Sequence, residues 1–296
     1  MKKRLFGILL FAILCTFSVT VAQMPLEDEL YAYVLGIEGR SHIDRGGFIK
    51  DQLHKMGVGY VTSAFSKAII QGKDTLTING ENIIARFGRG NKRIVVGAHY
   101  DTFSDSPGAN DNGSGVAVVL ALINHLESVG WNYSIDFCFF DQEESGSLGS
   151  LNYIKQFVVP KQHLTMINLD IEGTGEEVFV GPVGNNNRLL TRYIDEAAQK
   201  TGFPLVKRSE FPGSDQDSFS KYHLESICIS IVPEGDSDRL SKYVHNGYRT
   251  DSTEVPKVLS SMHTVDDRSN LVSPASLKMS YEFTKALLLL LNDSRR

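Results

Sequence analysis

Short apolar runs, each followed closely by histidine or a carboxylate, constrain the fold of this chain more than any other feature. Apolar residues fill most positions of the runs at 94–98, 135–140, 166–169 and 227–232, rather than every second position. Strands of this kind are buried on both faces, as in largely parallel sheets that helices cover on both sides. Segments with helical spacing separate the runs, which is the pattern of an α/β fold. The sequence therefore predicts a three-layer α/β sandwich with a mostly parallel central sheet.

Periodicity places the remaining elements. Two further strands are expected at residues 83–87, at an edge of the sheet, and at 178–180. Helices are expected at 24–56, with breaks at Gly39 and at Gly46–Gly47, and at 116–129, 148–157, 189–200 and 275–291. The apolar end of the last helix is too short to span a bilayer and is expected in the core. Residues 233–261 are expected to form a loop or lid beside the site.

The first 22 residues have the pattern of a secretory signal peptide. A basic start, Lys2 to Arg4, precedes an apolar run that closes on the small residue Ala22. An uncleaved membrane anchor is the alternative, and the run lies at the lower length limit for spanning. We therefore expect residues 1–22 to be removed and residues 23–296 to form one catalytic domain. That domain would be exported to the periplasm or the exterior, with no stable membrane insertion.

The charge of the chain argues against a nucleic-acid partner, and the positions of its cysteines argue against a disulfide framework. The chain has 30 basic and 35 acidic residues, a net charge of −5, and no dense basic cluster outside its extreme termini. Nucleic acid is therefore not an expected partner. Cys138 and Cys228 each lie in an apolar run and are expected to be buried and free. A disulfide is the alternative in an oxidising compartment.

Five polar motifs follow in chain order, and together they indicate a metal site. They are His99 with Asp101, a glycine-rich segment around Asp111, the pair Glu143 and Glu144, then Asp170, then His263. Each alone has an ordinary explanation, such as a solvated pair, a capping turn or a wet surface. In parallel sheets, however, the carboxyl ends of the strands meet at one edge. Two histidines and three carboxylates there would suit a pair of divalent ions, with a further carboxylate as proton acceptor.

In order and spacing these motifs resemble the secreted two-zinc aminopeptidases of the bacterial leucyl aminopeptidase type, from about Ile94 to the C-terminus. The resemblance implies a zinc exopeptidase fold, with a mixed, mostly parallel sheet between helices. It implies two zinc ions, with Asp111 bridging them. It assigns His99, Asp111 and Asp170 to one ion, and Asp111, Glu144 and His263 to the other. It further implies that Glu143 is the general base and that Asp101 orients His99.

Two places test the resemblance more finely. Asn110 and Asn112 flank Asp111 where the family often has aspartate, which changes the local charge and removes no ligand. Ser214, Asp215 and Phe219 are similar to a family segment near the pocket, which makes Asp215 a candidate either for substrate contact or for supporting the residues that touch substrate or metal.

The implied activity is removal of N-terminal residues from peptides with a free amino terminus, with Glu143 taking a proton from water. A single-zinc glutaminyl cyclase of the same fold is the alternative. The loop around Asp111 looks more like the aminopeptidases, and Met262 stands where the cyclases tend to carry tryptophan. A non-catalytic binding module of this fold is the third candidate, but such modules lose ligands that this chain keeps.

Overall fold

The computed structural model describes residues 24–71, 74–184, 188–249 and 255–294. The predicted signal peptide lies outside the described residues. Within them, one sheet of eight strands has the order β1-β2-β4-β3-β5-β8-β6-β7. The strands are β1 (Tyr60–Gln71), β2 (Asp74–Phe87), β3 (Arg93–His99), β4 (Ser134–Phe140), β5 (His163–Leu169), β6 (Glu177–Gly181), β7 (Leu205–Lys207) and β8 (Ser226–Val232).

Parallel pairing forms the centre of the sheet and antiparallel pairing its flanks. Strand β3 runs parallel to both β4 and β5, and β5 runs parallel to β8. Antiparallel pairs join β2 to β1 and β4 on one flank, and β6 to β8 on the other. The predicted mixed, mostly parallel sheet is confirmed.

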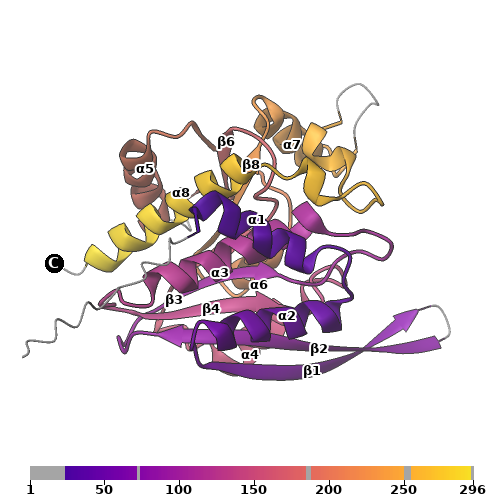
Figure 1. Ribbon diagram of the computed structural model, residues 1–296, viewed down its shortest axis with the longest axis horizontal. Coiled ribbons are helices and arrows are strands. Elements are labelled where there is room, and N and C mark those ends of the chain that lie inside the picture. Colours follow the sequence, from indigo (N-terminus) through magenta and orange to yellow (C-terminus); the bar gives the residue numbers. More distant parts are fainter. Residues whose placement is uncertain (1–23, 72–73, 185–187, 250–254, 295–296) are drawn as a thin grey trace, which may run out of the picture.

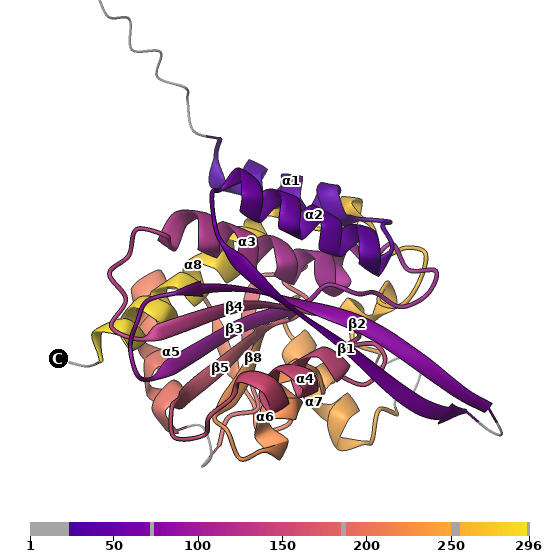
Figure 2. The same ribbon diagram turned by 90° about the horizontal axis from the view of Figure 1, so that it is seen from below.

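Helices cover both faces of this sheet, as predicted. In Figure 2, α1, α2, α3 and α8 lie on one side of the sheet, and α4 and α6 lie on the other. None of the described helices is long and apolar enough to cross a membrane. The helices are α1 (Leu26–Ile37), α2 (His42–Lys55), α3 (Gly115–Leu126), α4 (Leu148–Phe157), α5 (Arg188–Thr201), α6 (Asp215–Lys221), α7 (Asp236–His245) and α8 (Pro274–Asp293), with short turns η1 (Ala109–Ser114), η2 (Lys257–Ser260) and η3 (Ser269–Leu271).

The largest core lies between the sheet and the layer of α1, α3 and α8. Helix α3 is buried along residues 115–123, because it lies under α1 and α8 and also contacts β3. Of the three cysteines, the two that the structure describes are free and buried in the strands that were predicted to hold them, β4 for Cys138 and β8 for Cys228.

The main departure from the prediction is the β1–β2 hairpin. The strand expected at 83–87 is the last third of β2, and it lies inside the sheet, between β1 and β4. The first half of β2 pairs only with β1, and the two strands project beyond the carboxyl end of β4 (Figure 1). Side chains there are mostly exposed on both faces, as with Ile70 and Leu76, so no buried face marks these strands in the sequence.

Smaller departures concern local breaks. Helix α2 runs unbroken through Gly46 and Gly47, where a break was expected. The described parts of the segment 233–261, which leave out residues 250–254, contribute to the pocket at the site and contain α7 and η2 rather than a loop alone. Strand β7 and helix α6 were not predicted, because three and seven residues are too few to show a period.

Candidate metal centre and active site

The ends of neighbouring strands bring the predicted ligands together. Strand β3 ends at His99 and β5 ends just before Asp170, and these two strands are paired in parallel. Glu144 follows β4, which is the other neighbour of β3. The ligand atoms fall into two groups, each within 4.8 Å: His99, Asp111 and Asp170, and Asp111, Glu144 and His263. These are the two sets that the resemblance assigns to two ions.

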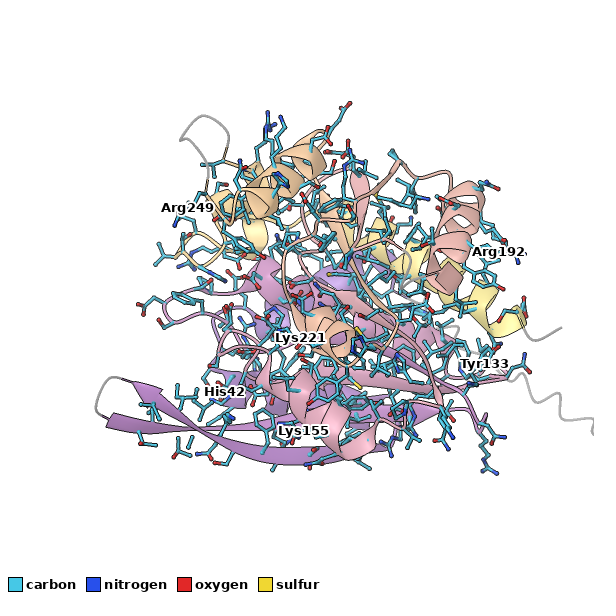
Figure 3. The ribbon with its side chains drawn as sticks, turned by 180° about the vertical axis from the view of Figure 1, so that it is seen from behind. His42, Tyr133, Lys155, Arg192, Lys221 and Arg249 are labelled. Atoms are coloured by element: carbon cyan, nitrogen blue, oxygen red, sulfur yellow. The ribbon has the colours of Figure 1, made fainter. Side chains whose placement is uncertain are left out.

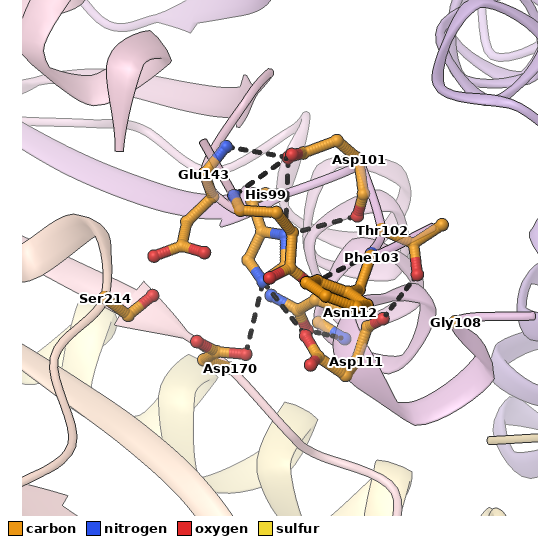
Figure 4. Close-up of polar contacts among 12 residues, drawn as sticks. His99, Asp101, Thr102, Phe103, Gly108, Asp111, Asn112, Glu143, Asp170 and Ser214 are labelled. Atoms are coloured by element: carbon orange, nitrogen blue, oxygen red, sulfur yellow. Dashed lines mark hydrogen bonds and ion pairs between the residues drawn. The ribbon is translucent and has the colours of Figure 1, made fainter. Parts of the chain in front are cut away.

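Asp111 lies between the two groups and faces a different histidine with each oxygen. Its Oδ1 is 3.2 Å from Nε2 of His99, and its Oδ2 is 3.1 Å from Nε2 of His263. Asp170 completes the first group, with Oδ1 3.5 Å from His99 Nε2 (Figure 4). Glu144 completes the second, with Oε2 3.1 Å from His263 Nε2. A carboxylate placed in this way can bridge two cations.

The donor set fits divalent metal better than it fits hydrogen bonding alone. The buried Oδ1 of Asp170 accepts no hydrogen bond. Burial lowers the pKa of His99, but Asp170 and the other carboxylates around the ring outweigh burial and raise that pKa well above its usual value. Hydrogen bonds with Asp111 and Glu144 raise the pKa of His263 to about 10. The site thus holds an excess of negative charge, and imidazole with carboxylate is a donor set that zinc accepts.

The loop that carries Asp111 is fixed by groups that are not ligands. The carboxylate of Asp267 accepts the backbone N–H groups of Asn110 at 2.8 Å and Asp111 at 3.0 Å. Asn112 donates its side-chain amide to the carbonyl of Leu169 at 2.8 Å. An aspartate at position 112 could not donate this bond, so the departure from the family pattern has a local use. The sequence analysis missed Asp267, whose only signal is its place four residues after His263.

Arg45 of α2 holds the other end of the same loop. It is completely buried, and its guanidinium donates to the carbonyls of Tyr100, Pro107 and Gly108. Gly108 has φ +62, and a Cβ there would lie 2.4 Å from the guanidinium, so glycine is required. The sequence analysis missed Arg45, because nothing in α2 marks one arginine as buried.

Asp101 contacts both glutamates as well as His99. Its Oδ1 lies 3.5 Å from Nδ1 of His99, and its backbone carbonyl oxygen lies 3.3 Å from the same nitrogen. The same carboxylate accepts the backbone N–H groups of Glu143 at 2.9 Å and Glu144 at 3.1 Å (Figure 4). One side chain therefore fixes a ligand from β3 and the turn after β4 together.

Glu143 is a member of neither ligand group, although it lies beside both. Its side chain lines the adjoining pocket, and its Oε1 accepts a hydrogen bond from Ser147 at 3.3 Å. Burial raises the pKa of Glu143 well above its usual value; His99 opposes the shift, and Asp215 and Asp170 add to it. A carboxylate with a raised pKa is suited to accept and return a proton.

A pocket of about 370 Å³ opens at the ligand groups. Among the described residues, its only charged lining groups are Glu143 and the candidate ligands. The far wall is apolar and includes Phe179, Phe211, Val232, Leu240, Val258 and Leu259. Part of this wall comes from α7 and η2, which belong to the segment that was expected beside the site.

Asp215 lies behind the pocket rather than on its wall. It begins α6 and is completely buried, and both carboxylate oxygens lack a hydrogen-bond partner. Ser214, the residue before it, lines the pocket. Burial raises the pKa of Asp215 to about 7, and His99 opposes the shift.

Residues 82–287 match the model of peptidase family M28. The chain is 34% identical over 158 residues to the aminopeptidase YwaD of Bacillus subtilis, which covers 51% of this chain and 34% of that protein. It is 28% identical over 185 residues to a probable leucine aminopeptidase of Arthroderma otae, with 55% of this chain and 49% of that protein covered. The chain thus spans a third to a half of these curated relatives.

Solved structures of two kinds share the fold. A zinc aminopeptidase from Bacillus subtilis superposes with a TM-score of 0.72 at 15% identity, covering 93% of this chain and 97% of that one. A glutaminyl cyclase of Porphyromonas gingivalis superposes with a TM-score of 0.70 at 20% identity, covering 90% and 98%. At these identities the likeness shows the fold alone.

Proposed function

The chain belongs to peptidase family M28, and from that membership we propose that it is an exported, zinc-dependent aminopeptidase that removes N-terminal residues from peptides. The observation that carries the proposal is the position of Asp111, whose carboxylate oxygens lie 3.2 and 3.1 Å from Nε2 of His99 and His263. Glu143 lines the pocket beside them and belongs to neither ligand group. A metal-assisted hydrolase needs both parts, a ligand set and a free base.

Two ligand groups support two zinc ions per chain. His99, Asp111 and Asp170 would hold one ion, and Asp111, Glu144 and His263 would hold the second. When bound, zinc supplies Lewis-acid polarisation of the scissile carbonyl and lowers the pKa of water. Glu143 then accepts the proton of the attacking water and returns it to the leaving amine. Asp101 contacts both His99 and the backbone N–H of Glu143, and so would hold the two residues in position for this transfer.

The pocket supports exopeptidase action on apolar N-terminal residues. Its volume of about 370 Å³ and its apolar far wall suit one aliphatic or aromatic side chain. The free amino group of the substrate would then lie near the carboxylates of Glu143 and Asp170, which also line the pocket. A peptide with a blocked amino group could not form that ion pair, and neither could an internal residue of a longer chain, whose nitrogen is an uncharged amide.

Asp215 is proposed to act through Glu143 rather than by touching substrate. Its buried charge adds to the negative field that raises the pKa of Glu143. Residues 23–296 are proposed to work as a single exported domain after removal of residues 1–22. N-terminal sequencing of the exported product should begin near Gln23, and Met1 on a membrane-bound product would contradict export.

The test of the activity is a substrate panel combined with metal analysis. We expect the purified chain to hydrolyse leucyl, methionyl and phenylalanyl p-nitroanilides faster than lysyl or glutamyl ones. A chelator should abolish this activity, zinc should restore it, and elemental analysis should find about two zinc ions per chain.

The same panel separates the alternatives. Cyclisation of a glutamine-initiated peptide with one zinc ion and no hydrolysis would identify a glutaminyl cyclase. Neither reaction and no zinc would identify a binding module.

A further inference from the structure

A second hollow adjoins the ligand groups, on the side away from the apolar pocket. It is an open groove of about 730 Å³. Residues 39–42 and 101–107 line it, together with Gln142, Glu144, Ser145 and Arg268. Glu144 is the one residue that lines both hollows. The metal centre therefore separates an apolar pocket from a polar groove.

Phe103 marks the path from one hollow to the other. Its ring stacks on His263, with centroids 4.7 Å apart, and its backbone N–H donates to Glu144 Oε1 at 3.1 Å. Figure 4 shows Glu143, Asp170 and Ser214 on one side of His99, and Asp101, Thr102 and Phe103 on the other. A peptide whose first side chain fills the pocket and whose first carbonyl lies at the ligands therefore continues past Phe103 into the groove.

The groove carries two arginines with little competition from acidic groups. Arg40 is exposed, and its guanidinium lies over the ring of Phe48, 5.3 Å from the centroid; no ion pair engages it among the residues that the structure describes. Arg268 is 58% exposed, and its nearest carboxylate is that of Glu38, at 4.0 Å. A guanidinium over an aromatic ring keeps its N–H groups at its edge, and an exposed ion pair at 4.0 Å is weak. Both arginines can therefore still bind a ligand carboxylate in a two-pronged geometry.

The other charged groups of the groove are largely engaged. Asp101 accepts two backbone amides, and Glu144 belongs to a ligand group. His42 pairs with Asp141 and lies on the side of the molecule from which the β1–β2 hairpin projects (Figure 3). Asp105 is the remaining acidic group of the lining, so the two arginines outnumber it.

We propose that the groove binds the leaving part of the substrate and that Arg40 and Arg268 bind a carboxylate on it. The carboxylate is either the C-terminus of a short peptide or an aspartate or glutamate side chain after the scissile bond. This proposal rests on the proposed aminopeptidase function and adds the substrate class: peptides with negative charge on the leaving side.

The experiment compares matched substrates with and without that carboxylate. Leu-Gly, Leu-Gly-Gly and Leu-Gly-Gly-Gly are assayed as free acids and as C-terminal amides, alongside the amide Leu-Glu-Gly-NH2. We expect kcat/KM to be about tenfold higher with a carboxylate, the range of a charged hydrogen bond at a wet site. The preference should weaken as salt rises. Preference for the acids identifies the C-terminus as the ligand, and preference for the glutamyl amide identifies the side chain.

Variants assign the preference to the two arginines. In the double variant Arg40→Gln with Arg268→Gln, the ratio of kcat/KM with the preferred carboxylate to kcat/KM without it should fall to about one. The control is Arg89→Gln, an exposed arginine between β2 and β3 outside the groove, which makes the same charge change and should leave the ratio intact. Thermal unfolding and zinc content of each variant establish that it is folded and loaded.

Two results would overturn the proposal: a ratio near one in the unaltered protein for every pair, or a full ratio in the double variant. Leucyl p-nitroanilide, which has no carboxylate, separates this failure from a larger one. If it is cleaved while neither the acids nor the glutamyl amide shows an advantage, only the groove proposal fails. If neither it nor any peptide is cleaved, the proposed aminopeptidase function fails as well.

Discussion

The two ligand groups differ in how much of each belongs to the protein core. The side chain of His99 is 1% exposed, and His99 and Asp170 stand at the ends of two paired central strands. The side chain of His263 is 38% exposed, and His263 and Glu144 both come from turns outside the strands. The histidines make the difference, since the side chains of Asp170 and Glu144 are 15% and 12% exposed. We call the first the buried group and the second the exposed group.

This difference teaches how one centre can combine tight binding with access. Charges in a low-dielectric interior interact more strongly than charges near water, and ligands on strands move less than ligands on turns. The buried group should therefore hold its ion more tightly. The exposed group, which borders both hollows through Glu144, should exchange its ion more readily.

The largest expected effect concerns the residue that belongs to neither group. Glu143→Gln should lower kcat by about 10²–10⁴-fold, because an amide cannot take the proton from water. Zinc content should remain that of the unaltered protein, since Glu143 is in neither ligand set. The matched control is Glu127→Gln at the exposed end of α3, which should change neither quantity. Loss of zinc from the Glu143 variant, or near-normal turnover, would reverse the roles of Glu143 and Glu144.

Ligand variants test whether the two groups are separate sites. Asp111→Asn should weaken both ions, because one carboxylate serves both groups. His99→Ala should empty the buried group, and His263→Ala the exposed one, leaving about one zinc per chain in each case. Elemental analysis after gel filtration measures this. Equal retention of both ions in the three variants would show that the ligand assignment is wrong.

A smaller effect should distinguish the exposed group alone. Phe103→Ala removes the ring that stacks on His263, and such contacts contribute about 0.5–1.5 kcal/mol. Zinc affinity of the exposed group should fall by roughly 2–12-fold, measured by competition with a chromogenic chelator. Affinity of the buried group should not change. Tyr60→Ala, an exposed aromatic residue at the start of β1, is the control. If both affinities fall together, the two groups are not independent.

The smallest effect uses a histidine far from the metal centre. Burial lowers the pKa of His163, whose Nε2 lies 3.1 Å from the carbonyl oxygen of Glu225. The unfolded chain therefore binds a proton at a higher pH than the folded chain. Stability from this residue is present above the unfolded pKa of about 6.5 and is lost as pH falls through it.

Denaturant unfolding at pH 7.5 and 5.5 measures the size of that loss. His163→Phe keeps a ring next to Phe219 and does not titrate, so it should lose about 1 kcal/mol less stability than the unaltered protein on acidification. An identical loss in both would show that burial alone does not shift this histidine. Neighbouring carboxylates raise the pKa of His99 although that residue is buried too. His163 could then no longer serve as the example of a histidine whose pKa is shifted by burial alone.

Sequence patterns were informative wherever side-chain chemistry and strand burial coincide. The fold class and strand β4 were predicted because buried strands are apolar at most positions. The proximity of His99 and Asp170 was predicted because the carboxyl ends of parallel strands meet at one edge of a sheet. The projecting half of the β1–β2 hairpin was missed, because exposed strands carry no burial pattern. Asp267 was missed because it accepts backbone N–H groups, which every residue except proline has.

Arg45 lies outside the segment that matches the family model, although it contacts the loop that carries Asp111. The match begins at residue 82, yet the loop between His99 and Asp111 takes its shape from a guanidinium on α2. A chain trimmed to the matched residues would keep every candidate ligand. It would lose Arg45, which holds the loop between His99 and Asp111. By linkage, metal that binds only the arranged loop also stabilises α2, although α2 contributes no ligand. Protection of α2 amides from hydrogen exchange would therefore report on zinc occupancy at a distance.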